Sequence, residues 1–299
     1  MKKTLARRKV KKSFIDSIVL KYLVRKNQNY IELRGKQIAV FANDWIGSNI
    51  FVKGVFAKEE IDDLIYIFQI IKIDTNKSTA LDIGANIGNH ALQFANFFQY
   101  VEAYEPNPIT YKLLDLNCND NKNIRCHNFG LGDKEENLTL YENFLNNGAS
   151  SIYLNERNIS YNNHEIKILR IDSFLNSFNN IKLMKIDVEG MEFEVISGAV
   201  KTIRTHKPII AFEQFLTEFK APAKETKSID LLRSLGYEIF WLKNNNTQLP
   251  WFFRRLKNIY QLCFGDIQNR EIITNTKVPP GSYSMLFGVH KNNLKELKL

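Results

Sequence analysis

The chain has 299 residues, 44% of them apolar and 24% charged, which is enough to bury one full core together with an extension. Its net charge of +9 suits a nucleic acid, an anionic lipid surface or an acidic glycan equally well, so charge alone selects no partner. The three cysteines form no C-x-x-C pair, which argues against a disulfide framework and a zinc site. A reducing compartment is the simplest expectation.

Residues 1–53 are expected to form a basic N-terminal extension with one helix and a short β element. The opening MKKTLARRKVKK is similar to the basic region of a signal peptide, but Asp16 and Lys21 interrupt the apolar run that follows. No stretch approaches the ~20 apolar residues that span a bilayer, so a cytoplasmic protein is expected. Apolar side chains recur at helical spacing among lysines and arginines in residues 11–26, which predicts an amphipathic basic helix.

Two interpretations of this basic helix remain open. It could lie peripherally on an anionic membrane, such as the inner surface of the cell membrane, or pack on its own domain with solvated lysines, and packing is favoured. Residues 30–33 and 37–41 are expected to be two short strands that turn at Arg34 and Gly35.

The remainder, residues 54–299, alternates helical and strand patterns, which predicts an α/β doubly wound domain. Strands are expected at 79–83, 100–104, 123–128, 138–141, 166–171, 183–186, 208–212, 237–242 and 283–289. Helices are expected at 59–72, 90–98, 111–119, 172–178, 191–206 and 228–235. Residues 244–280 form an aromatic and basic insertion, interpreted either as a flap over the core or as a contact with substrate or membrane.

The stretch ALDIGANIGNH, residues 80–90, is typical of the first strand-turn-helix unit of such a sheet, where an adenosine cofactor binds. Its glycines, Gly84 and Gly88, suit a turn with positive φ and a close backbone approach. An acid, Asp82, precedes the first glycine; it would repel a pyrophosphate but suits a cation. S-adenosylmethionine carries a sulfonium, an ammonium and no phosphate, and is therefore the expected cofactor.

Three further acids are expected around the same edge of the sheet. Glu105 ends the second strand in the run YEPNP, where an acid can accept hydrogen bonds from both ribose hydroxyls; Glu102, inside the strand, is the weaker candidate. Asp187 and Glu189 follow the strand at 183–186, beside the cofactor turn, which is where the reacting atom lies in an open parallel sheet.

The segments DIGANIG, YEPNP, GLGD, GASS, RIDSFL, KIDVEGMEFEVISGA and KPIIAFE occur in this order between residues 54 and 290. Together they closely resemble the FkbM-type S-adenosylmethionine-dependent methyltransferases. The resemblance implies the class I methyltransferase fold, a Rossmann-like seven-stranded sheet with its last strand antiparallel. It also implies O-methylation of a hydroxyl, often on a sugar or a lipid-linked glycan, in glycan biosynthesis.

Carried over to this sequence, the resemblance assigns the residues of the cofactor site. Those around the methionine end would be Asp82, Gly84, Asn86 and Gly88. Glu105 would hold the ribose, and Gly130 with Leu131 would face the adenine.

A hydroxyl that attacks a methyl group must lose its proton, which requires a general base or a metal ion. The candidates are the three carboxylates at the strand ends, Asp187, Glu189 and Glu213. A divalent metal is compatible with this set and is not assigned. The histidines are weaker candidates: His90 is interpreted as helix packing, His164 as a loop residue and His206 as a helix C-terminal charge.

Two alternative functions agree with parts of the sequence. A nucleic-acid methyltransferase would suit the positive charge, but enzymes of this fold that methylate base amino groups carry a D/N-P-P-Y/F loop where this chain has Asp187-Val188-Glu189-Gly190. A binding protein without turnover is the other alternative, and the intact acids argue against it. The expected partner is a carbohydrate or glycolipid acceptor, and the sequence does not fix the oligomeric state.

Overall fold

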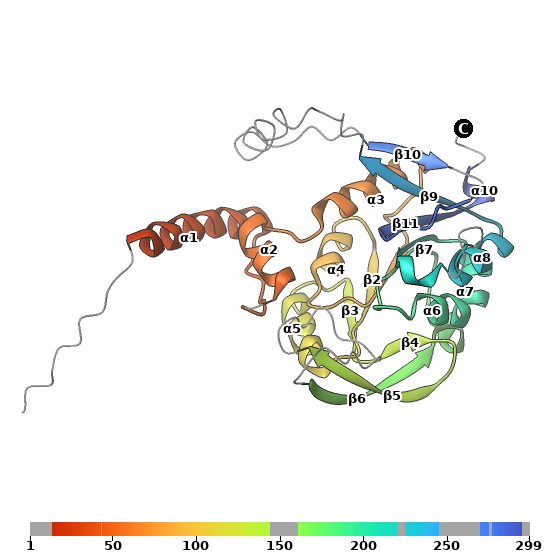
Figure 1. Cartoon of the computed structure of the whole chain (residues 1–299), viewed down its shortest axis with the longest axis horizontal. Coiled ribbons are helices and arrows are strands. Elements are labelled where there is room, and N and C mark those ends of the chain that lie inside the picture. Colours follow the sequence, from red (N-terminus) through yellow and green to blue (C-terminus); the bar gives the residue numbers. More distant parts are fainter. Residues whose placement is uncertain are drawn as a thin grey trace, which may run out of the picture.

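The computed structural model describes residues 14–42, 44–143, 161–219, 225–244, 270–274 and 277–294. Its centre is an eight-stranded sheet in the order β10-β9-β11-β8-β7-β1-β2-β3 (Figure 1). In chain order these strands are β1 (Thr79–Ile83), β2 (Tyr100–Tyr104), β3 (Ile124–His127), β7 (Ile181–Ile186), β8 (Ile209–Gln214), β9 (Tyr237–Asn244), β10 (Arg270–Thr274) and β11 (Tyr283–His290).

The directions of these strands define the fold class. Strands β3, β2, β1, β7 and β8 run parallel, and β11 lies antiparallel between β8 and β9. Seven strands thus form the expected doubly wound sheet with the last strand reversed. β10, from within the predicted insertion, pairs with β9 and adds an eighth strand at the edge. The strand order reverses at β1, which lies between β2 and β7, and such a switch point is where open α/β sheets bind ligands.

Helices cover both faces of the sheet because successive strand residues point to opposite faces. Ala80 belongs to the apolar core on one face, and Leu81 belongs to the core on the other. The first core is closed by α3 (Lys58–Ile71), α4 (Asn89–Phe94) and α5 (Pro108–Cys118). The second core is closed by the 3-10 helix η2 (Ile171–Ser177), α6 (Glu192–Gly198), α7 (Val200–His206) and α8 (Lys227–Ser234). The short helices η3 (Leu216–Glu218) and α10 (Lys291–Leu294) follow β8 and β11.

A second, three-stranded sheet has the order β4-β6-β5. Its strands are β4 (Gly130–Gly132), β5 (Glu136–Asn143) and β6 (Tyr161–Arg170). His164 therefore lies in a strand and not in a loop, which corrects the prediction. The loop GASS, residues 148–151, lies outside the described residues.

The helix predicted over residues 191–206 is two helices, α6 and α7, with a break at Ala199. Ala199 has φ −110° and ψ 9°, outside the helical range. The preceding Gly198 lies so close to β4 that an added Cβ would stand 1.9 Å from the Gly132 carbonyl oxygen. The contact with β4 thus fixes the end of α6 at a point that the apolar periodicity does not mark.

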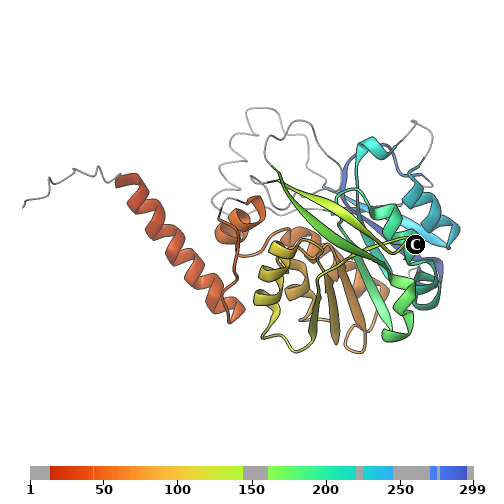
Figure 2. The ribbon, with the colours of Figure 1, turned by 90° about the horizontal axis from the view of Figure 1, so that it is seen from below.

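The N-terminal extension holds α1 (Phe14–Arg34) and α2 (Trp45–Lys53). The strand predicted at 30–33 is wrong, because the helix continues to Arg34 and ends only before Gly35, whose φ is +72°. Residues 37–41 form no strand either. Figures 1 and 2 show α1 projecting from the domain, with its end near Arg34 close to α2, so the favoured packing holds for the second half of the helix and not for the first. Among the described helices, none is long and apolar enough to cross a membrane.

Candidate active site

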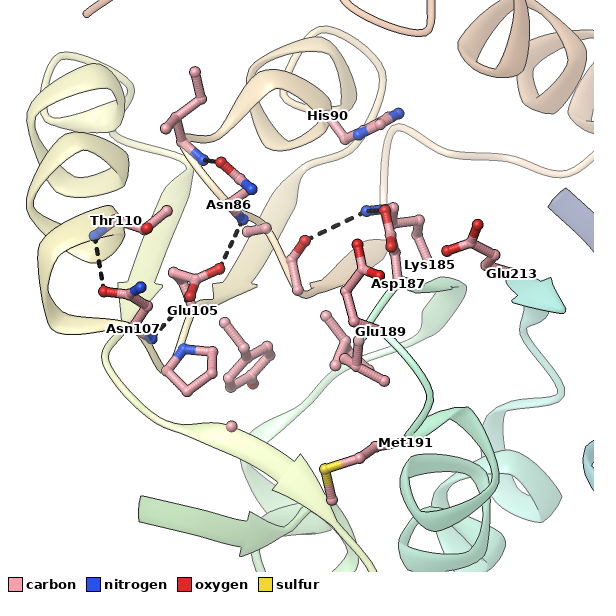
Figure 3. Close-up of a pocket in the computed structure, with 18 of the residues that line it drawn as sticks. Asn86, His90, Glu105, Asn107, Thr110, Lys185, Asp187, Glu189, Met191 and Glu213 are labelled. Atoms are coloured by element: carbon pink, nitrogen blue, oxygen red, sulfur yellow. Dashed lines mark hydrogen bonds and ion pairs between the residues drawn. The ribbon is translucent and has the colours of Figure 1, made fainter. Parts of the chain in front are cut away.

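A cavity of about 340 Å³ opens at the carboxyl ends of β1, β2 and β7, at the switch point of the sheet (Figure 3). The cofactor turn, the β4 strand and helix α2 contribute to its wall. The predicted site residues that line it are Gly84, Asn86, Glu105, Gly130, Leu131, Asp187, Glu189 and Glu213. Asp82 and Gly88 are not on this wall.

The turn after β1 requires glycine for two structural reasons. Gly84 has φ +79°, and an added Cβ would stand 1.8 Å from the carbonyl oxygen of Asp187. Gly88 has φ +91°, and its Cβ would stand 3.0 Å from Cys118 Sγ and from Leu114. The space beside Gly84 is therefore filled by the backbone that follows β7. The sequence had suggested that a ligand fills it.

Asp82, predicted at the methionine end of the cofactor, lies beneath the turn, fully buried and off the cavity wall. It is paired in register with Lys185 on β7, whose Nζ lies 3.6 Å from Asp82 Oδ1 and 3.0 Å from Asp187 Oδ2. The same ammonium donates to the Gly84 carbonyl at 3.4 Å. Lys185 therefore joins the first strand, the turn and the β7 end, so Asp82 supports the shape of the site through Lys185.

The charges of this buried group depend on one another. Burial raises the pKa of Asp82, and Lys185 opposes that shift. Burial alone would lower the pKa of Lys185, but the neighbouring carboxylates of Asp187 and Asp82 hold it above its ordinary value. Lys185 in turn holds the pKa of Asp187 below its usual range in spite of burial. Lys185 is therefore protonated and Asp187 ionised at neutral pH.

Glu105 lies at the β2 end of the cavity, where backbone N–H groups fix its carboxylate. The Asn86 N–H donates to Oε2 at 3.0 Å and the Asn107 N–H donates to Oε1 at 2.8 Å. Burial raises the pKa of Glu105 to about 7, although both hydrogen bonds favour the ionised form. The Asn107 side chain accepts from Ile109 N–H at 2.8 Å and caps α5, so the helix start holds the YEPNP turn in place.

The acids predicted at the strand ends do converge. One carboxylate oxygen from each of Asp187, Glu189 and Glu213 lies within 4.8 Å of the other two. Burial, followed by the charge of Asp187, raises the pKa of Glu189 to about 7 and that of Glu213 to about 8. Three oxygen ligands at this separation could also hold a hard divalent cation. The cluster therefore provides either a proton acceptor or a metal site.

Sequence reasoning missed Glu192, a fully buried acid at the start of α6. Its Oε1 accepts from the N–H groups of Val188 at 3.1 Å and Gly190 at 3.3 Å, and burial raises the pKa of Glu192 to about 7. These bonds hold the loop in which Glu189 adopts φ +54°. The sequence did contain a sign of this role: Glu192 is an acid at a position where the helical periodicity predicts a buried apolar residue.

His90 lies in α4 with only 7% of its surface exposed, which agrees with the predicted role in helix packing. It also lines the cavity, which was not predicted. Its Nε2 has no hydrogen-bond partner among the described residues. Burial, together with Lys185, lowers the pKa of His90 to about 3. The imidazole is therefore neutral at physiological pH. His206 is the last residue of α7, as predicted.

The sheet order, the glycine turn at the switch point and the acid after β2 define a class I methyltransferase architecture. The family model described as the methyltransferase FkbM domain matches residues 82–239, more than half of the chain. The chain belongs to this family of S-adenosylmethionine-dependent methyltransferases.

A curated relative, Methyltransferase 1 of Beauveria bassiana (strain ARSEF 2860), is 28% identical over 144 residues. The match covers 40% of this chain and 58% of that protein, so it spans little more than half of the relative's length.

Two solved structures show a similar arrangement. Methyltransferase FkbM from Methylobacillus flagellatus KT is 17% identical with a TM-score of 0.40, covering 72% of this chain and 44% of that chain. Magnesium protoporphyrin IX methyltransferase from Synechocystis PCC 6803, solved with bound S-adenosylmethionine, is 8% identical with a TM-score of 0.40. That match covers 95% of this chain and all of the other.

Proposed function

We propose that this protein transfers the methyl group of S-adenosylmethionine to a hydroxyl of a sugar in a glycan or glycolipid. The observation that carries the proposal is the carboxylate cluster of Asp187, Glu189 and Glu213 at one end of the cavity. A hydroxyl is a weak nucleophile until its proton is removed, and a carboxylate with a pKa near the working pH removes it efficiently. The proposal includes a cytoplasmic site of action, because the free thiols Cys118 and Cys126 suit a reducing compartment.

The residues at the other end fit the cofactor. Each oxygen of Glu105 accepts one backbone N–H, which leaves acceptor capacity on both oxygens for the two ribose hydroxyls. Gly130 and Leu131 line the cavity and would contact the adenine, and the turn around Asn86 would contact the methionine end. When bound, S-adenosylmethionine supplies an electrophilic methyl group on a sulfonium.

Within the cluster the three carboxylates have different tasks. Asp187, paired with Lys185 at 3.0 Å, stays ionised and contributes a fixed negative charge. Glu189 and Glu213, with pKa values raised to about 7 and about 8, exchange protons near neutral pH. One of these two accepts the hydroxyl proton as the oxygen attacks.

A metal-assisted route uses the same three side chains. A divalent cation held by Asp187, Glu189 and Glu213 would lower the pKa of a bound acceptor hydroxyl, as it does for bound water. Removal of metal distinguishes the two routes. Activity that is lost on chelation and returns with a divalent ion means a metal, and activity that is indifferent to the chelator means a direct base.

The test is the transfer of labelled methyl from S-adenosylmethionine to fractionated cell glycans and lipids, using wild type, Glu189→Gln and Glu213→Gln. We expect at least one of these variants to lose about two decades in rate, the range for a placed carboxylate base. Glu194→Gln is a matched control, because Glu194 lies on α6 outside the cavity wall. Wild-type turnover by both cluster variants with a verified acceptor would refute this mechanism, and label entering only nucleic acid would refute the acceptor class.

A further inference from the structure

The second half of α1 is clamped to α2 by hydrogen bonds to the carbonyls at the end of that helix. Asn27 Nδ2 donates to the Phe51 carbonyl at 2.7 Å, and Tyr30 Oη donates to that of Val52 at 3.1 Å. Arg34 donates to the Gly54 carbonyl. A helix leaves its last carbonyls without intrahelical partners, and α1 satisfies them here. The orientation of α1 is therefore fixed relative to α2.

The extension is also fixed to the cofactor turn. The Asn117 side chain on α5 pairs with the backbone of Ala39 through two bonds, at 2.7 Å and 2.9 Å. The same side chain donates to the Ile87 carbonyl in the turn at 2.8 Å. Asn117 therefore binds both the segment between α1 and α2 and the glycine turn after β1. These bonds attach the N-terminal extension to the domain beside the cavity.

The first half of α1, in contrast, presents mainly apolar side chains to solvent. Phe14 is 78% exposed and Ile15 70% exposed. Exposed apolar residues continue along the helix at Ile18, Val19, Leu20, Tyr22 and Val24. Figures 1 and 2 show this part of α1 standing clear of the domain. So many exposed apolar side chains on one helix mark an interaction site.

The positive charge of the chain is concentrated at its N-terminal end, in α1 and above all in the residues that precede it. Residues 1–34 hold eleven lysines and arginines and two acidic residues, a balance equal to the net charge of +9 of all 299 residues. The rest of the chain is therefore neutral overall. Two copies of this segment would repel each other, so the partner is anionic. A nucleic acid would pair with the charges but leave the apolar side chains in water, whereas an anionic lipid surface accommodates both.

Helix α2 connects this surface to the site. Trp45 and Ile46, at its start, line the cavity, and Trp45 is 68% exposed. Tryptophan prefers the boundary between lipid and water. We propose that α1 binds an anionic lipid surface and thereby holds the α2 rim of the cavity at the membrane, where the acceptor is a lipid-linked sugar. The acceptor part of this inference rests on the proposed methyltransferase function.

The docking part is tested by sedimentation of the full chain with vesicles of equal phosphatidylglycerol and phosphatidylcholine. We expect Lys21→Glu with Arg25→Glu to lower the partition coefficient at least tenfold. Lys77→Glu with Lys112→Glu is the matched control; it changes the net charge equally at exposed sites outside the extension and should bind as wild type. Binding should also weaken as salt rises, and vesicles of phosphatidylcholine alone should bind poorly.

The apolar contribution is tested with Ile15→Ser and Ile18→Ser together. These side chains are exposed, so the substitutions leave the core intact, and we expect at least a tenfold loss of binding. The matched control replaces the exposed Tyr66 and Leu116 by Ser. If the α1 variants bind vesicles as well as wild type does, or if they lose binding to a duplex nucleic acid instead, the docking proposal is overturned.

The acceptor part is tested by following labelled methyl in a membrane fraction. We expect the label in lipid-extractable products, with the rate reduced in the α1 variants and unchanged in their controls. Label confined to water-soluble glycans would overturn the lipid-linked acceptor while leaving the methyltransferase function intact. Vesicle binding by α1 without methyl transfer to any fraction would refute the proposed function and leave the docking intact.

Discussion

The two ends of the cavity hold acids in opposite surroundings. Glu105 is fixed by two backbone N–H donors, whereas Glu213 is surrounded by the charges of Asp187 and Glu189. Burial raises the pKa of both glutamates, but for Glu213 the neighbouring charges add to the shift and for Glu105 the donors reduce it. The first arrangement suits a fixed hydrogen-bond acceptor, and the second suits a group that gains and loses a proton. The proposed cofactor contact and the proposed activation of the acceptor therefore lie at different ends of the cavity.

The largest predicted effect concerns Lys185, whose ammonium pairs with Asp82 and with Asp187 of the carboxylate cluster. Its removal should lower the free energy of unfolding. Lys185→Met should destabilise the protein by about 3 to 5 kcal/mol, the range for breaking one partner out of a buried ion pair. Urea unfolding measures this effect. Lys182→Met, at a partly exposed position of the same strand, is the control. An unchanged unfolding midpoint would mean that Asp82 is neutral in the native protein.

The next effect is on the chemical step. Asp187→Asn should lower kcat while S-adenosylmethionine still binds, because it removes the charge that helps to raise the pKa of Glu189 and of Glu213, and with it their strength as proton acceptors. Single-turnover transfer to a verified acceptor and calorimetry with the cofactor separate these two quantities. Equal loss of rate and of cofactor affinity would instead place Asp187 at the cofactor end.

A smaller effect is expected at the other end of the cavity. Glu105→Ala should weaken S-adenosylmethionine binding by about 1.5 to 3 kcal/mol, the range for hydrogen bonds to a charged group. Calorimetry with the cofactor and with its demethylated product measures this directly, and both ligands should be affected alike because they share the ribose. A folded Glu105→Ala variant with unchanged affinity would remove Glu105 from the cofactor site.

The last effect is a pH dependence of stability. Glu213 has a pKa of about 8 in the folded protein and an ordinary value of 4.5, so the folded state binds more protons between these pH values. Its contribution to stability therefore falls as pH rises from about 5 to 8. Unfolding curves of wild type and Glu213→Gln in that window should differ in slope, with the variant less sensitive to pH. Parallel curves would contradict the raised pKa.

Much of the fold was predictable because strong local signals agreed with the tertiary structure. The strand at 79–83, the glycine turn and the proline-capped start of α5 follow from residue types that allow few alternatives. The strand predicted at 30–33 is wrong, because long-range contacts of Tyr30 and Arg34 with the end of α2 accompany a continued helix. The strand predicted at 37–41 is wrong too, and there the backbone of Ala39 bonds to the Asn117 side chain and not to another strand. β10 was not predicted, because residues 245–269 separate it from its partner β9 and no local turn pattern links the two strands.

The site was predictable to the extent that strand ends determine it. Asp187, Glu189 and Glu213 meet because the carboxyl ends of parallel strands share one edge of the sheet. Lys185 was not recognised, although a lysine within an apolar strand requires a buried acid as its partner. The sequence does not show the strand register that places Lys185 beside Asp82. Asp82 was therefore predicted to contact the cofactor and not a buried lysine.

The close approach of Gly84 to the Asp187 carbonyl has a consequence for protein engineering. A second contact of the same kind joins Gly198 to the Gly132 carbonyl. Each contact couples two motifs that are far apart in the chain, with no room for a methyl group between them. A chimera that exchanges the first strand-turn-helix unit or the α6 segment with a relative must therefore keep glycine at positions 84 and 198. Crossovers that keep both glycines should fold, and those that place any larger residue at either position should fail even when every element is individually compatible.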